Sequence, residues 1–252
     1  MCLVAIAWKV HPDFPLVISA NRDEFFERPT QNLHQWDSKI YAGKDLRSGG
    51  TWLGFHSNGR WALLTNYRDF STSLKPIISR GKLVQNWLEG QSAPKQYLGE
   101  IGKSQENYEG FNLLVSDGKS LWYLSNYGNG IEEINPGIHA ISNGLLNDPW
   151  PKTELAKAQL TALMETEPNE NKLLHILKST ETYELERLPS TGVPIDMEIA
   201  LSAQFVRIGE SYGTVSAIAV VQEASGLVRM KERTYQIKYG DYLDTALSFT
   251  LI

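Results

Sequence analysis

The stretch Met1-Cys2-Leu3-Val4-Ala5-Ile6-Ala7-Trp8 decides the fold of this 252-residue chain. It is apolar, rich in β-formers and short, which is typical of a buried strand. The single cysteine of the sequence lies at its start, directly behind the initiator methionine. Because residue 2 is small, methionine aminopeptidase is expected to remove Met1. Cys2 would then carry a thiol and a free α-amine on one residue, at the beginning of a rigid strand.

Two interpretations of Cys2 stay open. A thiolate is a strong nucleophile, and an α-amine titrates near ~8, so the amine could take the thiol proton, as in N-terminal nucleophiles. The alternative is that Cys2 is a small buried hydrophobic residue, as many lone cysteines are. The nucleophile interpretation predicts a thiol pKa below the free value of ~8.5 once Met1 is removed.

The composition limits the classes of function. The chain has 24 basic and 29 acidic residues, a net charge of −5 and no basic run, so we expect no nucleic-acid partner. The single cysteine excludes an intrachain disulfide and fits a reducing compartment. Lys9 ends the N-terminal apolar run before it reaches the length of a signal-peptide core or a membrane span. We therefore expect a cytoplasmic protein without a membrane span.

The order of the expected elements indicates an α+β fold. Short strands occur in pairs towards both ends of the chain, with helices between them and no regular βαβ alternation, which argues against a parallel Rossmann sheet. No repeat, linker or low-complexity segment interrupts the sequence, so we expect a single domain over residues 1–252. Dinucleotide and phosphate-loop motifs are absent, and the histidines have no zinc-ligand spacing, so no cofactor or metal is expected.

The first hairpin is expected to contain the site. Residues 3–8 and 15–20 predict two paired strands, followed by a charged cluster at 21–29 that ends in proline. In register, the hairpin brings Asp23 towards Cys2, where a carboxylate could hold the α-amine while Arg22 or Arg28 balances the charge. The alternative is a solvated turn with local ion pairs, which contribute little to stability.

The remaining elements are predicted from periodicity and turn residues. A second hairpin pairs residues 51–55 with 60–64, and Asn66 follows where its second strand ends. Such strand ends commonly carry polar groups of functional sites. Helices are predicted over residues 81–88, 94–101, 152–165 and 173–177, and further strands over 111–115, 121–125, 138–142, 203–208, 214–221 and 227–237.

Several motifs together resemble the NRDE family, which includes the TANGO2-like (transport and Golgi organisation protein 2) proteins. The resemblance spans nearly the whole chain, and the co-occurrence of the motifs is far more specific than any one of them. It implies an N-terminal-nucleophile hydrolase-like fold, an α+β four-layer αββα sandwich of two antiparallel sheets. The matching motifs are Cys2, Asn-Arg-Asp-Glu at 21–24, Gly-Gly-Thr-Trp-Leu-Gly at 49–54, Ser-Arg-Gly at 79–81, Ser-Asn-Gly-Leu-Leu at 142–146, Pro-Trp-Pro-Lys at 149–152 and Tyr-Gly-Thr at 212–214.

A fainter similarity connects the chain to the cysteine amidases of that fold, the bile-salt hydrolases and penicillin V acylases. It implies that Cys2 is the nucleophile and that Asp23 orients its amine. The backbone of Asn66 and the side chain of Asn143 would hold an oxyanion, an interaction worth about 3 kcal/mol per donor in the transition state. Three further residues are expected to bind the substrate: Arg22, Tyr67 and Arg207.

The sequence lacks an arginine that these families have. The amidases have an arginine where this chain has Gln204, and NRDE proteins often have one where this chain has Val215. Arg207 is the nearest candidate, although it matches neither position.

Two functions from different classes follow. The first is an N-terminal cysteine hydrolase that acts on a C–N (amide) bond of a small or acyl-chain substrate, and the pairing of Cys2 with Asp23 favours it. The second is a non-catalytic TANGO2-like binding or trafficking protein for haem or acyl-chain ligands. The departures at Gln204 and Val215 favour it, as would retention of Met1. A scaffold without chemistry is a third alternative.

Overall fold

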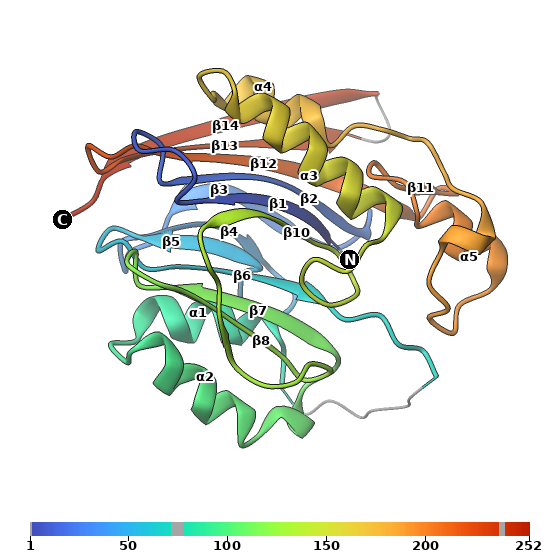
Figure 1. Cartoon of the computed structure of the whole chain (residues 1–252), viewed down its shortest axis with the longest axis horizontal. Coiled ribbons are helices and arrows are strands. Elements are labelled where there is room, and N and C mark those ends of the chain that lie inside the picture. Colours follow the sequence, from blue (N-terminus) through green and yellow to red (C-terminus); the bar gives the residue numbers. More distant parts are fainter. Residues whose placement is uncertain (1, 72–77, 237–239) are drawn as a thin grey trace. The chain divides into compact units, whose positions relative to one another are not determined.

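The computed structural model describes residues 2–71, 78–236 and 240–252. They form two antiparallel sheets with helices packed against each sheet (Figure 1). The chain divides into two compact units, of which the first comprises Met1–Glu27, Asp69–Ser71 and Pro136–Phe249. The second comprises Arg28–Arg68, Thr72–Asn135 and Thr250–Ile252. The predicted α+β class with two antiparallel sheets is confirmed, whereas the single domain over residues 1–252 stays a prediction.

The first unit contains a sheet with the strand order β10-β1-β2-β12-β13-β14, in which β11 also pairs with β12. The N-terminal strand β1 lies between β10 and β2, and all its side chains are buried. An internal strand at residues 3–8 is therefore confirmed. The strands of this sheet are β1 (Cys2–Trp8), β2 (Leu16–Phe25), β10 (Gly137–Ile141), β11 (Arg207–Ile208), β12 (Tyr212–Gln222), β13 (Leu227–Gln236) and β14 (Asp241–Thr250).

The charged Asn-Arg-Asp-Glu segment is the continuation of β2. The prediction that the strand ends at residue 20 was wrong, because β12 pairs with β2 along its whole length. The register runs from Leu16 opposite Gln222 to Phe25 opposite Tyr212, with an irregularity between Thr214 and Ser216. Partner-strand hydrogen bonds outweigh the low strand propensity of these polar residues.

Helices α3 (Pro151–Met164) and α4 (Glu170–Ile176) cover one face of the first sheet, and α3 runs along β1 (Figure 1). Their apolar side chains form one buried cluster with Leu3, Ala5 and Ala7 of β1. Because successive side chains of a strand point to opposite faces, Cys2, Val4 and Ile6 face away from these helices. A short helix α5 (Ile195–Ala200) and the 3-10 turn η2 (Leu185–Arg187) lie in the connection that leads to β11.

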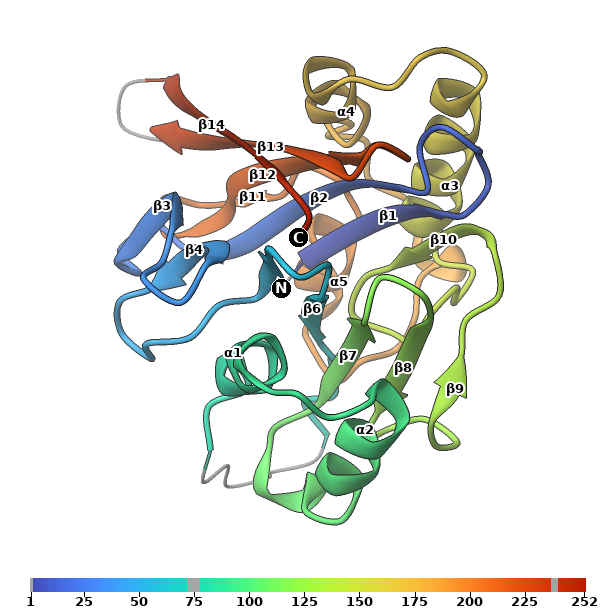
Figure 2. The same cartoon turned by 90° about the vertical axis from the view of Figure 1, so that its left-hand side faces the viewer.

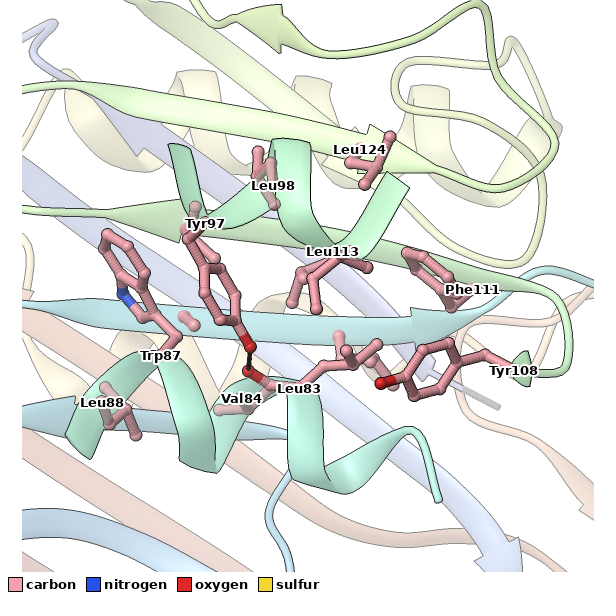
Figure 3. Close-up of a cluster of buried hydrophobic side chains, with 14 of the residues drawn as sticks. Leu83, Val84, Trp87, Leu88, Tyr97, Leu98, Tyr108, Phe111, Leu113 and Leu124 are labelled. Carbon is pink, nitrogen blue, oxygen red and sulfur yellow. Dashed lines mark hydrogen bonds between the residues drawn. The ribbon is translucent and has the colours of Figure 1, made fainter. Parts of the chain in front are cut away.

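The second unit contains a sheet with the strands in chain order, from β3 to β9. Its helices are α1 (Gly81–Glu89) and α2 (Pro94–Gly102), followed by the 3-10 turn η1 (Gln105–Asn107). Figure 3 shows the apolar cluster beneath these helices, where the Tyr97 hydroxyl donates a 2.6 Å hydrogen bond to the carbonyl oxygen of Leu83. The strands are β3 (Thr30–Gln35), β4 (Ile40–Asp45), β5 (Leu53–His56), β6 (Trp61–Asn66), β7 (Phe111–Ser116), β8 (Leu121–Ser125) and β9 (Glu132–Glu133).

Some elements differ from the prediction. No strands were predicted at β3, β4, β9 and β14. β3 and β14 are edge strands with many exposed polar residues, and β14 lies beside β13 at the border of its sheet (Figure 2). Most of the strand predicted at residues 203–208 is irregular, with only β11 paired. The last residue of the predicted strand 227–237, Ile237, lies outside the described residues.

Within the described ranges, no helix is long and apolar enough to cross a membrane. The same residues contain no group of three or more histidine, cysteine or acidic side chains arranged to hold a metal ion.

Candidate active site

Cys2 lies at the first position of β1, directly opposite Arg22 of β2. The cysteine is 7% exposed, and its sulfur accepts a hydrogen bond from the backbone N–H of Asp23. The hairpin register therefore brings the thiol and the Asn-Arg-Asp-Glu segment together, as the nucleophile interpretation requires.

The Asp23 carboxylate is buried and held from a distant strand. It accepts a 2.8 Å hydrogen bond from the Thr214 hydroxyl of β12. That hydroxyl in turn accepts a 2.9 Å hydrogen bond from the backbone N–H of Val206, and the Thr214 N–H donates to the Val206 carbonyl at 2.9 Å. The hydroxyl and the backbone N–H of Thr214 are thus both hydrogen-bonded to Val206. The position of the Asp23 carboxylate is therefore fixed jointly by β2, by β12 and by the segment that contains Val206.

The electrostatics of Cys2 and Asp23 are dominated by burial. Burial raises the pKa of the Cys2 thiol to about 11, and the nearby Asp23 carboxylate adds to this rise, while the amino terminus, Arg22 and the Asp23 N–H act in the opposite direction. Burial also raises the pKa of Asp23, against the positive charges of the amino terminus, Lys152 and Arg22 and the Thr214 hydrogen bond. With Met1 in place, the thiol is therefore neutral near physiological pH, and the lowered thiol pKa stays a prediction for the chain without Met1.

Asn143 lies at the same end of β1, in the loop after β10. The Ser142 hydroxyl donates a 2.9 Å hydrogen bond to the Cys2 carbonyl and lies 3.3 Å from Oδ1 of Asn143. Both residues are buried. The structure thus brings Cys2, Asp23 and Asn143 together in the first unit.

Asn66 and Tyr67 belong to the second unit. Asn66 is the last residue of β6 and pairs with Phe111. The Tyr67 ring stacks on Tyr127 with a centroid distance of 4.1 Å, and its N–H donates to the Gly110 carbonyl at 3.0 Å. Their approach to Cys2 stays a prediction.

The two arginines expected to bind substrate differ in their surroundings. Arg22 is buried beside the thiol, and its Nη2 lies 3.5 Å from Oε2 of Glu24. Arg207 is an exposed residue of the short strand β11, opposite Gly213. Of the two, only Arg22 contributes a charge that acts on both Cys2 and Asp23.

Lys152 is the charged residue that the sequence analysis did not place in the site. It lies in the first turn of α3, is 2% exposed, and donates a 2.8 Å hydrogen bond from Nζ to the Leu201 carbonyl. Its positive charge acts on Asp23. Gln204 is buried beside it and donates to Oε1 of Gln159 at 2.8 Å and to the Lys152 carbonyl at 3.4 Å.

Each of the residues missed by sequence reasoning had a signal in the sequence. Ser142, Lys152 and Thr214 belong to the quoted Ser-Asn-Gly, Pro-Trp-Pro-Lys and Tyr-Gly-Thr motifs. A polar residue within such a motif is a candidate for the site as well as a mark of the family.

Comparison with known proteins identifies the family. The sequence profile of the family described as TANGO2, Transport and Golgi organisation 2, matches residues 1–237. The chain belongs to the TANGO2 family. The human Transport and Golgi organization protein 2 homolog is 29% identical over 285 residues, covering 100% of this chain and 99% of the human protein. Transport and Golgi organization protein 2 of Drosophila melanogaster is 23% identical over 261 residues, covering 93% and 92% of the two chains.

A solved structure shows the fold of this TANGO2 family member. The Caenorhabditis elegans N-acylethanolamine-hydrolyzing acid amidase ortholog matches with a TM-score of 0.50 and 11% sequence identity, covering 87% of this chain and 92% of the amidase. The predicted N-terminal-nucleophile hydrolase-like fold is therefore confirmed. At this identity the likeness concerns the fold alone.

Proposed function

We propose that this TANGO2 family member, after removal of Met1, is an N-terminal cysteine hydrolase that cleaves a C–N (amide) bond of a small or acyl-chain substrate. The observation that carries the proposal is the pairing of Cys2 with Asp23. The thiol accepts a hydrogen bond from the Asp23 backbone, and the Asp23 side chain is fixed by Thr214. A nucleophile whose base is held by a third group is the arrangement that activates thiols and hydroxyls for acyl transfer.

The proposed reaction has two steps. The α-amine of Cys2 takes the thiol proton, and the sulfur attacks the amide carbonyl. The C–N bond then breaks as the ammonium group gives this proton to the leaving amine, which forms a thioester on Cys2. Water hydrolyses the thioester, so the acid is released and the thiol is restored. Asp23 holds the amine in the orientation that both proton transfers need.

Asn143 is the proposed oxyanion donor of the first unit. Its Oδ1 lies at the Ser142 hydroxyl, so Nδ2 is the end of the amide that can donate to the developing negative charge. A donor fixed in this way stabilises the transition state more than a mobile one, because no reorganisation is needed during the reaction. The backbone of Asn66 is the proposed second donor.

The second candidate is a binding protein that uses the same site for an acyl chain or haem. The observation that favours it is the thiol pKa of about 11 with Met1 in place, because a neutral buried thiol does not attack an amide. The names of the TANGO2 relatives, which refer to transport and Golgi organisation, support a trafficking role for this candidate. The single cysteine supports the cytoplasm as the location in either case.

Incubation with the acetyl and dodecanoyl amides of 7-amino-4-methylcoumarin tests the proposal. We expect coumarin release and a transient acyl adduct on the N-terminal peptide, both absent in Cys2→Ala. Intact mass establishes that Met1 has been removed in each preparation. Binding of either amide without coumarin release, in protein without Met1, contradicts the hydrolase and supports the second candidate.

A further inference from the structure

Lys152 is a buried charged side chain that the proposed reaction does not use. At 2% exposure it is among the most buried charged residues of the first unit. A buried ammonium group loses most of its hydration, which is costly unless an anion compensates the charge. Its position in the first turn of α3 adds to the cost, because the N-terminal end of a helix dipole is positive.

The hydrogen bond to the Leu201 carbonyl satisfies one of the three N–H groups of Lys152 without neutralising its charge. Asp23 is the buried carboxylate on which this charge acts. One segment of the chain connects the two residues. Gln204 donates a 3.4 Å hydrogen bond to the Lys152 carbonyl, and two residues later the Val206 N–H donates to the Thr214 hydroxyl that holds Asp23. Their proximity therefore depends on how α3 begins, directly after the Pro-Trp dipeptide.

The charges around Asp23 come from every element packed against it. On β2 itself, Arg22 is positive, but it also forms an ion pair with Glu24, so its charge does not act on Asp23 alone. β1 contributes the Cys2 thiol, and β12 contributes the neutral Thr214 hydroxyl. The amino terminus, whose positive charge acts on Asp23, precedes β1. Helix α3 contributes Lys152. Once the amino terminus of Cys2 acts as a base, it alternates between neutral and charged, whereas the Lys152 charge that acts on Asp23 takes no part in the proton transfers.

We propose that Lys152 is a positioning residue of the active site, whose buried ammonium group is the counter-charge that keeps the Asp23 carboxylate anionic so that it can hold the α-amine of Cys2. The inference rests on the proposed function for the role of Asp23. It also accounts for the missing arginine, because Gln204 lies against the backbone of Lys152 and the cation reaches the site from α3 instead.

The test is a titration of the Asp23 carboxyl by carbon NMR in aspartate-labelled protein, with the signal assigned by its loss in Asp23→Asn. Lys152→Gln is the main variant, because glutamine removes the charge but can still donate a hydrogen bond to Leu201. We expect its Asp23 midpoint to rise by about one pH unit or more, a tenfold change in the ionisation equilibrium. Lys152→Arg should restore the wild-type midpoint. Lys157 is a half-buried lysine of the same helix that pairs with Glu154, and Lys157→Met should leave the midpoint unchanged.

A second readout separates this inference from the proposed function. The acid limb of the Cys2 alkylation profile should move to higher pH in Lys152→Gln together with the Asp23 midpoint. If Lys152→Gln does not fold, Lys152→Met provides the same neutralisation. An Asp23 midpoint within about 0.3 pH units of wild type, a twofold change, overturns the role of Lys152. Conversely, a shifted midpoint in a protein whose Cys2 stays unreactive without Met1 supports the counter-charge and refutes the hydrolase.

Discussion

The Thr214 hydroxyl donates a 2.8 Å hydrogen bond to Oδ1 of Asp23 across 191 positions of the sequence. It lies where the register of β12 against β2 is irregular, between Thr214 and Ser216. Such irregularities redirect a side chain relative to the regular pleat. The position of the Asp23 carboxylate is thus a property of the sheet rather than of the Asn-Arg-Asp-Glu motif alone.

Replacement of Thr214 by the nearly isosteric valine should therefore harm both stability and the site. Asp23 loses its hydroxyl donor and the Val206 N–H loses its acceptor, so we expect a loss of about 1–3 kcal/mol in the free energy of unfolding. Alkylation of Cys2 in protein without Met1 should slow about tenfold, since misplaced positioning groups cost rate. Denaturant unfolding and iodoacetamide labelling measure the two effects.

Thr191→Val is the matched control for that variant. The Thr191 hydroxyl donates a 2.7 Å hydrogen bond to the buried Glu198 carboxylate, in the same unit but as part of a different network. The Thr191→Val variant should lose a similar amount of its free energy of unfolding, while its Cys2 labels at the wild-type rate. Equal slowing of labelling in both variants contradicts a specific role for Thr214.

The pKa of Asp23 predicts an unusual stability effect. Burial raises it above the ordinary value of 3.8, so folding favours the protonated carboxyl. This stabilising contribution is present at pH values below the unfolded pKa and is lost as the pH rises through the folded pKa. Asp23→Asn should therefore raise Tm near neutral pH, by about 2 °C or more, and should have little effect below about pH 3. The same variant should label more slowly at Cys2, because asparagine holds the amine less well.

Asp244 should give a pH dependence of stability opposite in sign to that of Asp23. Two hydrogen bonds from the Arg233 guanidinium, at 2.7 and 2.8 Å, lower the pKa of Asp244 to about 2. Its stabilising contribution is present above the unfolded pKa and is lost as the pH falls through the folded value. Asp244→Asn should lower Tm near neutral pH. Thermal melts in which both asparagine variants shift Tm in the same direction contradict the assignment of Asp23.

Asn143→Ala should separate acyl transfer from thiol activation. If Asn143 holds the oxyanion, coumarin release from the dodecanoyl amide should fall about 100-fold or more, because one such donor is worth that much in kcat. Iodoacetamide alkylation forms no oxyanion, so Cys2 should label at the wild-type rate. Loss of labelling together with coumarin release assigns Asn143 to the thiol instead.

The extent to which the sequence predicted this structure depends on where each residue lies. Strands β1 and β12 were predicted because they are buried and apolar, whereas the polar edge strands β3 and β14 lack that pattern. Motif comparison named Cys2, Asp23 and Asn143, which lie together in the first unit. Lys152 was missed as a site residue because its proposed role depends on how α3, which packs on β1 and β10, places its first turn. That relation is tertiary, and neither spacing nor periodicity encodes it.

The rate of Cys2 alkylation by iodoacetamide, measured against pH in protein whose intact mass shows that Met1 is absent, tests the central claim most directly. The control is a chain with glutamate inserted after Met1, where the large second residue prevents methionine removal and Cys2 keeps a peptide bond on its nitrogen. We predict that the processed protein labels faster near neutral pH than an ordinary thiol of pKa ~8.5, and that the extended chain hardly reacts because burial raises its thiol pKa to about 11. Processed protein that labels no faster than the extended chain contradicts an activated N-terminal nucleophile.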